Sequence, residues 1–193
     1  MEKIYFVRHG ETDWNRDRRI QGQSDLPLND VGRDQAHTLA VTLASIHFDA
    51  AFSSDLSRAL ETAEIVLQGR EIPIQLQIGL RERNFGKWEG RLADEIEVAG
   101  FLAGTGWPYV DAPPGGESVA DLDRRVVETV SAIGAAHPEQ TILMVAHGGV
   151  IRSALYAWVG VDAPIIANCG VYVIGVEDST PRLLEQVGES LLL

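Results

Sequence analysis

Two His-Gly pairs stand far apart in this chain of 193 residues, and each follows a run of apolar residues. The first pair begins at His9, directly after Arg8, and the second begins at His147. A further arginine, Arg58, comes shortly after a third apolar run. Arginine forms paired, charge-assisted hydrogen bonds with phosphate oxygens, and histidine can act as a nucleophile. These residue types indicate a pocket for a phosphoryl group, where Gly148-Gly149 would let backbone N–H groups approach the anion.

Each of these side chains also has a structural interpretation when it is taken alone. Arg58 lies three residues from both Asp55 and Glu61, a spacing typical of ion pairs on a helix surface. A single histidine is as often a structural residue as a catalytic one. The functional interpretation therefore depends on whether the fold brings the arginines and histidines together.

The pattern of apolar residues predicts strands that alternate with helices. This alternation favours an α/β fold of three layers, α/β/α, with a mostly parallel central sheet and an antiparallel edge strand at the C-terminal end. The expected strands cover residues 3–7, 50–53, 72–78, 141–146, 171–176 and 183–187, and the expected helices cover residues 29–46, 56–67, 119–133 and 149–159. We expect a single domain over residues 1–193.

In open parallel α/β sheets, ligands bind outside the carboxyl ends of the strands. Arg8 and His9 follow the first expected strand, and His147 follows the strand at residues 141–146. Arg58 lies in the first turn of the helix after the second strand. If these strands are parallel neighbours, all four side chains lie at the edge of the sheet formed by the carboxyl ends of the strands. We call this edge the crest of the sheet.

Residues 80–117 interrupt the alternation and predict a lid-like excursion over one face. The segment holds seven glycines, three prolines and two tryptophans, with a short helix expected near residues 92–101. Irregular segments of this length are usually functional. Glu82 lies near the start of the excursion, a suitable place for an acid that protonates a leaving oxygen. The alternative for Glu82 is an ion pair with Arg81 or Arg83.

Composition and motifs disfavour several other classes of protein. The formal net charge is −12 and the basic residues form no long run, so no nucleic-acid partner is expected. No apolar run approaches the roughly 20 residues of a membrane span, and the single cysteine, Cys169, fits a cytoplasmic protein. Two arginines would repel a metal ion. Ser118 is better interpreted as a helix N-cap paired with Asp121 than as a hydrolase nucleophile.

Several motifs occur in the same order as in a known family. They are Arg8-His9-Gly10-Glu11-Thr12 with Trp14-Asn15, Ser53-Ser54-Asp55-Leu56-Ser57-Arg58-Ala59 with Glu61-Thr62-Ala63, Leu80-Arg81-Glu82 with Phe85-Gly86 and Trp88-Glu89-Gly90, Gly115-Gly116-Glu117-Ser118, and Val145-Ala146-His147-Gly148-Gly149. In these motifs, which span most of the chain, the sequence resembles the phosphoglycerate-mutase-like branch of the histidine phosphatase superfamily.

The resemblance implies that His9 is the nucleophile and forms a phosphohistidine. It implies that Arg8, Arg58 and His147 hold the phosphoryl group. Glu82 would protonate the leaving group and then activate water, with no metal and no other cofactor. Further contacts with the substrate are expected from Asn15, Gln21, Gly22 and Gly148.

Phosphatase and mutase activities both fit this family. Cofactor-dependent mutases that resemble this chain carry Lys and Arg residues after the motif that contains Glu82, which we call the acid motif. No Lys or Arg occurs here from Leu92 to Asp123. We therefore expect a phosphatase for a small phosphorylated metabolite; a mutase and a weakly active, phosphate-binding regulatory protein are the alternatives. Trp107 and Tyr109 are candidates for substrate contact or for packing within the lid, and the final strand pair offers an edge for a homodimer.

Overall fold

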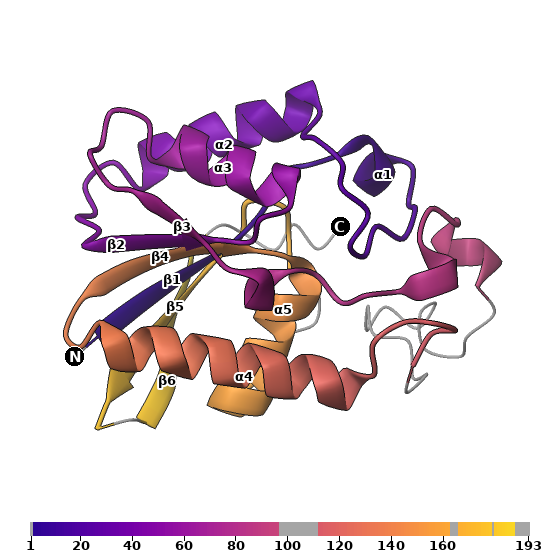
Figure 1. Ribbon diagram of the computed structural model, residues 1–193. Helices are drawn as coiled ribbons and strands as arrows, with labels where there is room; N and C mark the ends of the chain where they lie inside the picture. The colour runs from indigo at the N-terminus through magenta and orange to yellow at the C-terminus, as the bar shows by residue number, and fades with distance from the viewer. Residues whose placement is uncertain (1, 97–111, 163–165, 179, 188–193) are drawn as a thin grey trace.

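A sheet of six strands forms the middle of the computed structural model, which describes residues 2–96, 112–162, 166–178 and 180–187. The strands are β1 (Glu2–Arg8), β2 (Ala50–Ser53), β3 (Ile74–Leu76), β4 (Thr141–Ala146), β5 (Val171–Glu177) and β6 (Thr180–Val187). They lie in the order β3-β2-β4-β1-β5-β6 (Figure 1). The first four in this order are parallel, and β5 runs antiparallel to both β1 and β6. The mostly parallel sheet with an antiparallel C-terminal edge is thus confirmed.

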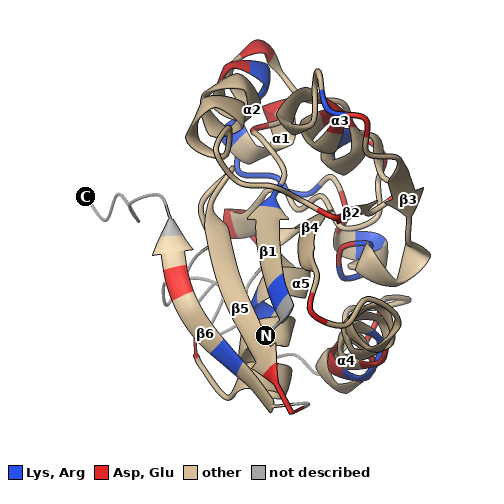
Figure 2. Cartoon of the chain, turned by 90° about the vertical axis from the view of Figure 1, so that its left-hand side faces the viewer, with Lys and Arg blue, Asp and Glu red and all other residues tan. Residues whose placement is uncertain are grey.

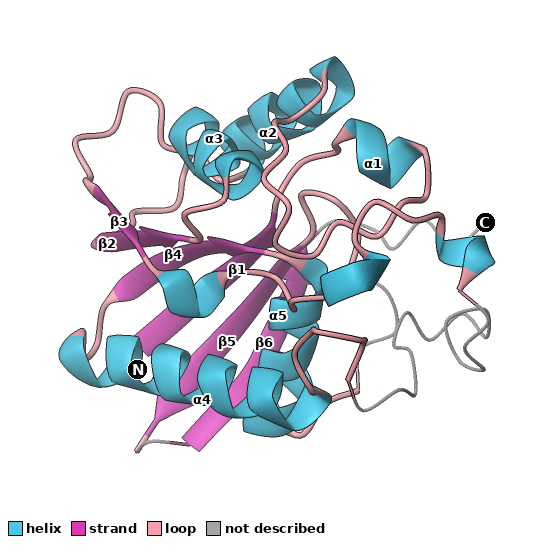
Figure 3. Cartoon of the chain, turned by 45° about the vertical axis from the view of Figure 1, so that its right-hand side comes forward, coloured by secondary structure: helices cyan, strands magenta, loops and turns pink. Residues whose placement is uncertain are grey.

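Helices cover both faces of the sheet and complete the predicted three layers (Figure 3). α2 (Asp30–Thr42) and α3 (Ser57–Val66) pack on one face. α4 (Val119–Ala136) packs on the other face with α5 (Gly148–Ser153), which continues as the π-helical segment η4 (Ala154–Val159). None of the helices in the described parts of the chain combines the length and the apolar character needed to cross a membrane.

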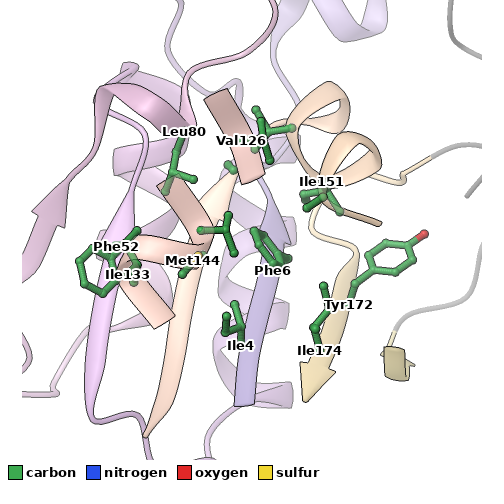
Figure 4. Packing of buried hydrophobic residues seen from close by; sticks show 14 of the residues in the cluster. Ile4, Phe6, Phe52, Leu80, Val126, Ile133, Met144, Ile151, Tyr172 and Ile174 are labelled. Carbon is green, nitrogen blue, oxygen red and sulfur yellow. The ribbon is translucent and has the colours of Figure 1, made fainter. Parts of the chain in front are cut away.

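The buried side chains form an apolar cluster on each face of the sheet. Along β1, Ile4 and Phe6 belong to the cluster under α4 and α5, whereas Tyr5 and Val7 belong to the cluster under α2 and α3. Figure 4 shows Ile4 and Phe6 among the side chains of the first cluster. Because helices cover both faces, the middle of β1, from Ile4 to Val7, can be apolar on both sides. The alternation continues to Arg8, which lies on the α5 side of the sheet beside Gly148.

Side chains cap the starts of two helices, and Ser118 is the cap that the sequence predicts. The side chain of Asn29 accepts the N–H of Gly32 at 2.8 Å at the start of α2. The hydroxyl of Ser118 accepts the N–H of Asp121 at 3.0 Å and donates to the carboxylate of Asp121 at 2.7 Å. The interpretation of Ser118 as the cap of α4 is therefore confirmed.

Two short segments differ from the prediction. No helix is expected between the strand at residues 3–7 and the helix that begins at residue 29, but this polar stretch contains the helix α1 (Asp13–Arg16), which Thr12 caps. Four residues are too few to show a helical period, which explains why the pattern does not reveal α1. The strand expected at residues 72–78 pairs only over Ile74–Leu76, because β3 is an edge strand with few buried side chains.

The described part of the expected lid-like excursion consists of turns and short 3-10 helices. The 3-10 helix η1 (Ile78–Leu80) leads into this segment, and the 3-10 helices η2 (Gly86–Trp88) and η3 (Ala93–Glu95) lie within it. Trp107, Tyr109 and the second half of the helix expected near residues 92–101 lie outside the described residues.

Candidate active site

The parallel pairing of β1 with β4 brings two predicted site residues side by side. Arg8 pairs with Ala146 at the carboxyl ends of the two strands, so the next residues, His9 and His147, are neighbours. Their ring centroids lie 5.2 Å apart, with the rings tilted by 58°. β2 ends on the other side of β4 and leads into α3, whose second residue is Arg58. Figure 2 shows the basic carboxyl end of β1 directly below α2 and α3.

The hydrogen bonds of His9 determine which ring nitrogen carries the proton. Nδ1 lies 2.7 Å from the backbone oxygen of Gly10, and because a carbonyl oxygen can only accept, Nδ1 must donate. Nε2 therefore keeps its lone pair, and it accepts the Nε–H of Arg58 at 3.3 Å. Burial, followed by the positive charges of Arg58 and Arg8, lowers the pKa of His9 well below its usual 6.5. His9 is thus neutral near pH 7 and can attack through Nε2.

Arg58 is fully buried between α3 and the segment that follows α1. Its Nη1 and Nη2 groups donate to the backbone oxygens of Ser24 and Gly22 at 2.8 and 2.7 Å. These carbonyl groups aim the Nε edge of the guanidinium at His9. Burial lowers the pKa of Arg58 to about 10, and the negative charge of Glu82 opposes this shift. The guanidinium therefore stays charged at neutral pH.

Other arginines make the ion pairs that were the alternative for Arg58. Arg81 donates to both carboxylate oxygens of Asp55, at 2.7 and 2.5 Å. Arg33 donates to Glu61 at 2.6 Å. The interpretation of Arg58 as a surface ion-pair residue is therefore wrong.

Arg8 and His147 contribute buried nitrogen atoms to the same crest. Nη1 of Arg8 donates to the backbone oxygen of Ile166, whereas its Nε is buried without a hydrogen-bond partner among the described residues. His147 is fully buried, and neither of its ring nitrogens has a hydrogen-bond partner within the described parts of the chain. Burial lowers the pKa of both side chains, and the charge of Arg58 lowers that of His147 further. Buried polar groups are normally paired, so these atoms suit a ligand with several acceptor oxygens.

Glu82 lies against the first turn of α5, at Gly149, two residues after His147. Its Oε2 accepts the N–H of Gly149 at 3.1 Å, and its Oε1 accepts the N–H of Arg83 at 2.8 Å. A Cβ at position 149 would lie 2.2 Å from Oε1, so a larger residue there would require the carboxyl group of Glu82 to move. The sequence predicts that this N–H faces an anion, and in the structure it donates to the carboxyl group of Glu82. Arg81, one of the two ion-pair partners considered for Glu82, donates to Asp55 instead.

The four predicted substrate contacts have different surroundings. Oδ1 of Asn15 accepts the N–H of Thr12 at 3.2 Å, which leaves the Nδ2 group to donate. Oε1 of Gln21 accepts the hydroxyl of Thr12 at 2.9 Å. The carbonyl oxygen of Gly22 accepts from Arg58, so Gly22 helps to hold that side chain in place. A Cβ on Gly148 would lie 3.6 Å from Nε of Arg8, which is ordinary contact.

Asn168 joins the site without any signal in the local sequence pattern. Its Nδ2 donates to the backbone oxygen of His9 at 3.0 Å and lies 3.4 Å from Oδ1 of Asn15. The following N–H, of Cys169, donates to the backbone oxygen of Arg8 at 3.0 Å. The signal that would have found Asn168 is topological, because β5 is antiparallel to β1 and therefore begins at the crest where β1 ends.

The donor set of this crest suits an anion. Within the described ranges, no group of three or more His, Cys, Asp or Glu residues is placed to hold a metal ion. The guanidinium groups of Arg8 and Arg58 and the imidazole of His147 instead lie around His9, a set that matches the charge and hydrogen-bonding capacity of a phosphoryl group.

Known proteins are similar to this chain in sequence and in fold. The model of the histidine phosphatase superfamily (branch 1) matches residues 4–187. Phosphoglycerate mutase-like protein 4 of Arabidopsis thaliana is 40% identical over 157 residues, 78% of this chain and 68% of that protein. Glucosyl-3-phosphoglycerate phosphatase of Mycolicibacterium vanbaalenii is 34% identical over 182 residues, 88% of this chain and 81% of that protein. The structure of Bacillus stearothermophilus YhfR has a TM-score of 0.86 and 36% identity and covers 95% of both chains. The chain therefore belongs to branch 1 of the histidine phosphatase superfamily.

Proposed function

We propose that this chain is a phosphomonoesterase that hydrolyses a small phosphorylated metabolite through a phosphohistidine on His9. The arrangement of His9 and Arg58 carries the proposal, because a neutral imidazole presents Nε2 at 3.3 Å from a buried guanidinium that two carbonyl groups hold in place. Membership of the histidine phosphatase superfamily and the similarity to glucosyl-3-phosphoglycerate phosphatase support a phosphatase activity.

In the first step, Nε2 of His9 forms a bond to the phosphorus of the monoester. The bond from phosphorus to the leaving oxygen breaks, and its electron pair goes to that oxygen, which takes a proton from Glu82. The Nδ1–H group, held by the backbone oxygen of Gly10, carries the positive charge of the phosphorylated ring. Arg8 and Arg58 stabilise the negative charge on the phosphoryl oxygens.

In the second step, a water molecule attacks the phosphorus from the side that the alcohol has left. Glu82, now a carboxylate, takes a proton from this water. The bond between phosphorus and Nε2 breaks, and its electron pair returns to His9. Inorganic phosphate leaves, and Glu82 holds the proton that the next cycle requires.

The charged groups must provide most of the rate acceleration. A positioned acid supplies only ~10²- to 10⁴-fold, whereas enzymes accelerate phosphate-monoester hydrolysis by up to ~10²¹-fold. The nucleophile divides the reaction into two steps, and the arginines act in both, because the same phosphoryl group stays at the crest throughout. His147, whose ring lies beside that of His9, adds a further donor.

A phosphoglycerate mutase is the second candidate, because phosphoglycerate mutase-like protein 4 is among the relatives. A mutase would return the phosphoryl group to a sugar-acid hydroxyl instead of water. The segment from Leu92 to Asp123 contains no Lys or Arg that would bind the second anionic group of a phosphoglycerate, which favours hydrolysis. Incubation with 2- and 3-phosphoglycerate separates the two, since release of phosphate without isomerisation identifies the phosphatase.

Phosphate release from an aryl phosphate, measured with a chelator present, tests the proposed mechanism. Wild type and His37→Ala, which changes an exposed histidine of α2, should be equally active. His9→Ala should be inactive, and Glu82→Ala should lose about 10²- to 10⁴-fold with an alkyl phosphate, whose leaving oxygen needs a proton. Full activity of His9→Ala, or a wild type that the chelator alone inactivates, would overturn the mechanism.

A further inference from the structure

The carboxylate of Glu89 accepts hydrogen bonds from two separate loops. Oε1 accepts the N–H of Gln23 at 3.0 Å and the N–H of Phe85 at 3.1 Å. Oε2 accepts both the N–H and the hydroxyl of Ser24, at 2.9 and 2.7 Å. Bonds to an ionised acceptor are roughly twice as strong as neutral ones, so Glu89 fixes the backbone of residues 22–24 firmly against the acid motif.

The same segment holds Arg58 from its other side. The carbonyl oxygens of Gly22 and Ser24 accept from the two Nη groups of Arg58. The carbonyl of Gly22 and the N–H of Gln23 belong to one peptide unit. That unit therefore donates to the carboxylate of Glu89 at one end and accepts from the guanidinium of Arg58 at the other. Hydrogen bonds linked in this way polarise and strengthen one another.

The contact between Glu89 and this segment leaves little space for adjustment. Gly22 has a φ of +54°, in the left-handed region that favours glycine. A Cβ on Gly22 would lie 2.1 Å from Oε1 of Glu89. The carboxylate thus fills the space that a Cβ at position 22 would need, and it lies directly against the peptide unit whose carbonyl oxygen accepts from Arg58.

We propose that Glu89 is a positioning residue that holds the guanidinium of Arg58 against His9 through the backbone of residues 22–24. The inference rests on the proposed function, in which Arg58 stabilises the phosphoryl group. Glu89 does not touch the substrate in this account.

The substitution Glu89→Gln keeps the shape and changes only the hydrogen bonding. The amide has one acceptor oxygen, so its NH₂ group must face the N–H of Gln23 and Phe85 or the donors of Ser24. We expect kcat/KM for an aryl phosphate to fall about 10- to 100-fold, the effect of losing bonds to a charged group. Glu95→Gln, the same change at an exposed residue of η3, should behave as wild type.

A double-mutant cycle with Arg58→Ala separates positioning from a general loss of structure. If Glu89 acts through Arg58, Glu89→Gln should cost nothing further once Arg58 is Ala. The inhibition constant of orthovanadate, which binds as a transition-state analogue, should rise by the same factor as kcat/KM falls. An unchanged Glu89→Gln enzyme, or an equal loss with and without Arg58, would overturn the proposal.

Thermal melting of each variant shows whether it is folded. If Glu89→Gln does not fold, Ser24→Ala replaces it in the same cycle, because it removes only the hydroxyl bond to Oε2. Its loss should be about threefold or more in wild type and absent in Arg58→Ala, and a loss of equal size in both backgrounds would again overturn the proposal. An inactive wild type would instead contradict the proposed function, and the inference would fail with it.

Discussion

The Nε atom of Arg58 lies 3.3 Å from Nε2 of His9. In the proposed mechanism, the positive charge of the guanidinium stands where negative charge would develop on the phosphoryl oxygens as Nε2 attacks. Burial and the same charge lower the pKa of His9 and keep its ring neutral, with Nε2 free of a proton. In this account one side chain serves both the nucleophile and the group that is transferred.

Replacement of Arg58 should affect both the rate and its pH dependence. Arg58→Lys should lower kcat by about 10²- to 10³-fold, because an ammonium group cannot donate to two carbonyls and face His9 as a planar fork. In Arg58→Ala the pKa of His9 should rise, since a charge that lowers it is gone. The acid limb of the kcat/KM profile, measured between about pH 4 and pH 8, should then move to higher pH. An acid limb that does not move would contradict this role.

The two buried histidines should make the protein less stable in acid. Burial lowers the pKa of both His9 and His147 well below 6.5, so below about pH 6.5 the unfolded chain binds protons that the folded protein does not. As the pH decreases from about 6.5, the free energy of unfolding should fall by about 1.4 kcal/mol per pH unit for each histidine, until the pKa of that histidine in the folded protein is reached. Urea unfolding at about pH 7.5 and pH 5.5 measures this loss.

The variant His147→Gln isolates one histidine in that experiment. It should lose less stability than wild type between the two pH values, whereas His37→Gln, at an exposed position, should follow wild type. Equal losses in wild type and His147→Gln would show that His147 is not buried in its neutral form.

A methyl group at position 149 should displace the acid. In Gly149→Ala the new Cβ would lie 2.2 Å from Oε1 of Glu82, so proton transfer to the leaving oxygen should suffer. We expect kcat/KM to fall at least about 10-fold more for an alkyl phosphate than for an aryl phosphate with an acidic leaving group. Gly148→Ala, which meets Arg8 at 3.6 Å, should have the smaller effect. Equal losses with both substrates would speak against displacement of Glu82.

Asn168 should contribute through its donor group. Asn168→Ala removes the bond to the backbone of His9 at 3.0 Å and the contact with Asn15, and kcat/KM should fall about 10-fold. Asn168→Asp has nearly the same shape but places an oxygen opposite two oxygens, so it should be worse than Asn168→Ala. Steady-state kinetics of the two variants provides the comparison, and a better Asp variant would contradict the assignment.

The centre of the fold could be predicted from the sequence because its burial leaves a simple pattern. β2 and β4 begin and end at the expected residues, Ala50–Ser53 and Thr141–Ala146. Both faces of these strands are covered, so the apolar run and the strand coincide. At the edge of the sheet the apolar pattern no longer predicts the length of a strand, and β3 (Ile74–Leu76) is shorter than the strand expected at residues 72–78.

The arrangement of the site could be predicted only in part. His9, His147 and Arg58 follow strand ends, so the order of strands is enough to bring them together. Their supporting partners were not predictable, because every residue has a carbonyl group and nothing in the sequence marks those of Gly22 and Ser24 as the acceptors for Arg58. Long-range contacts of this kind depend on the final packing of the loops.

Formation of a phosphoenzyme on His9 is the central claim, and it can be measured directly. Glu82→Ala protein would be mixed with an aryl phosphate whose leaving group needs little protonation, so that the first step proceeds while the attack of water is slowed. The mixture would be quenched in alkali, where phosphohistidine is stable, and its peptides analysed by mass spectrometry. We expect one phosphoryl group on His9 and none when His9→Ala is added to the same protein. A phosphoryl group on another residue, or continued turnover without His9, would contradict the account.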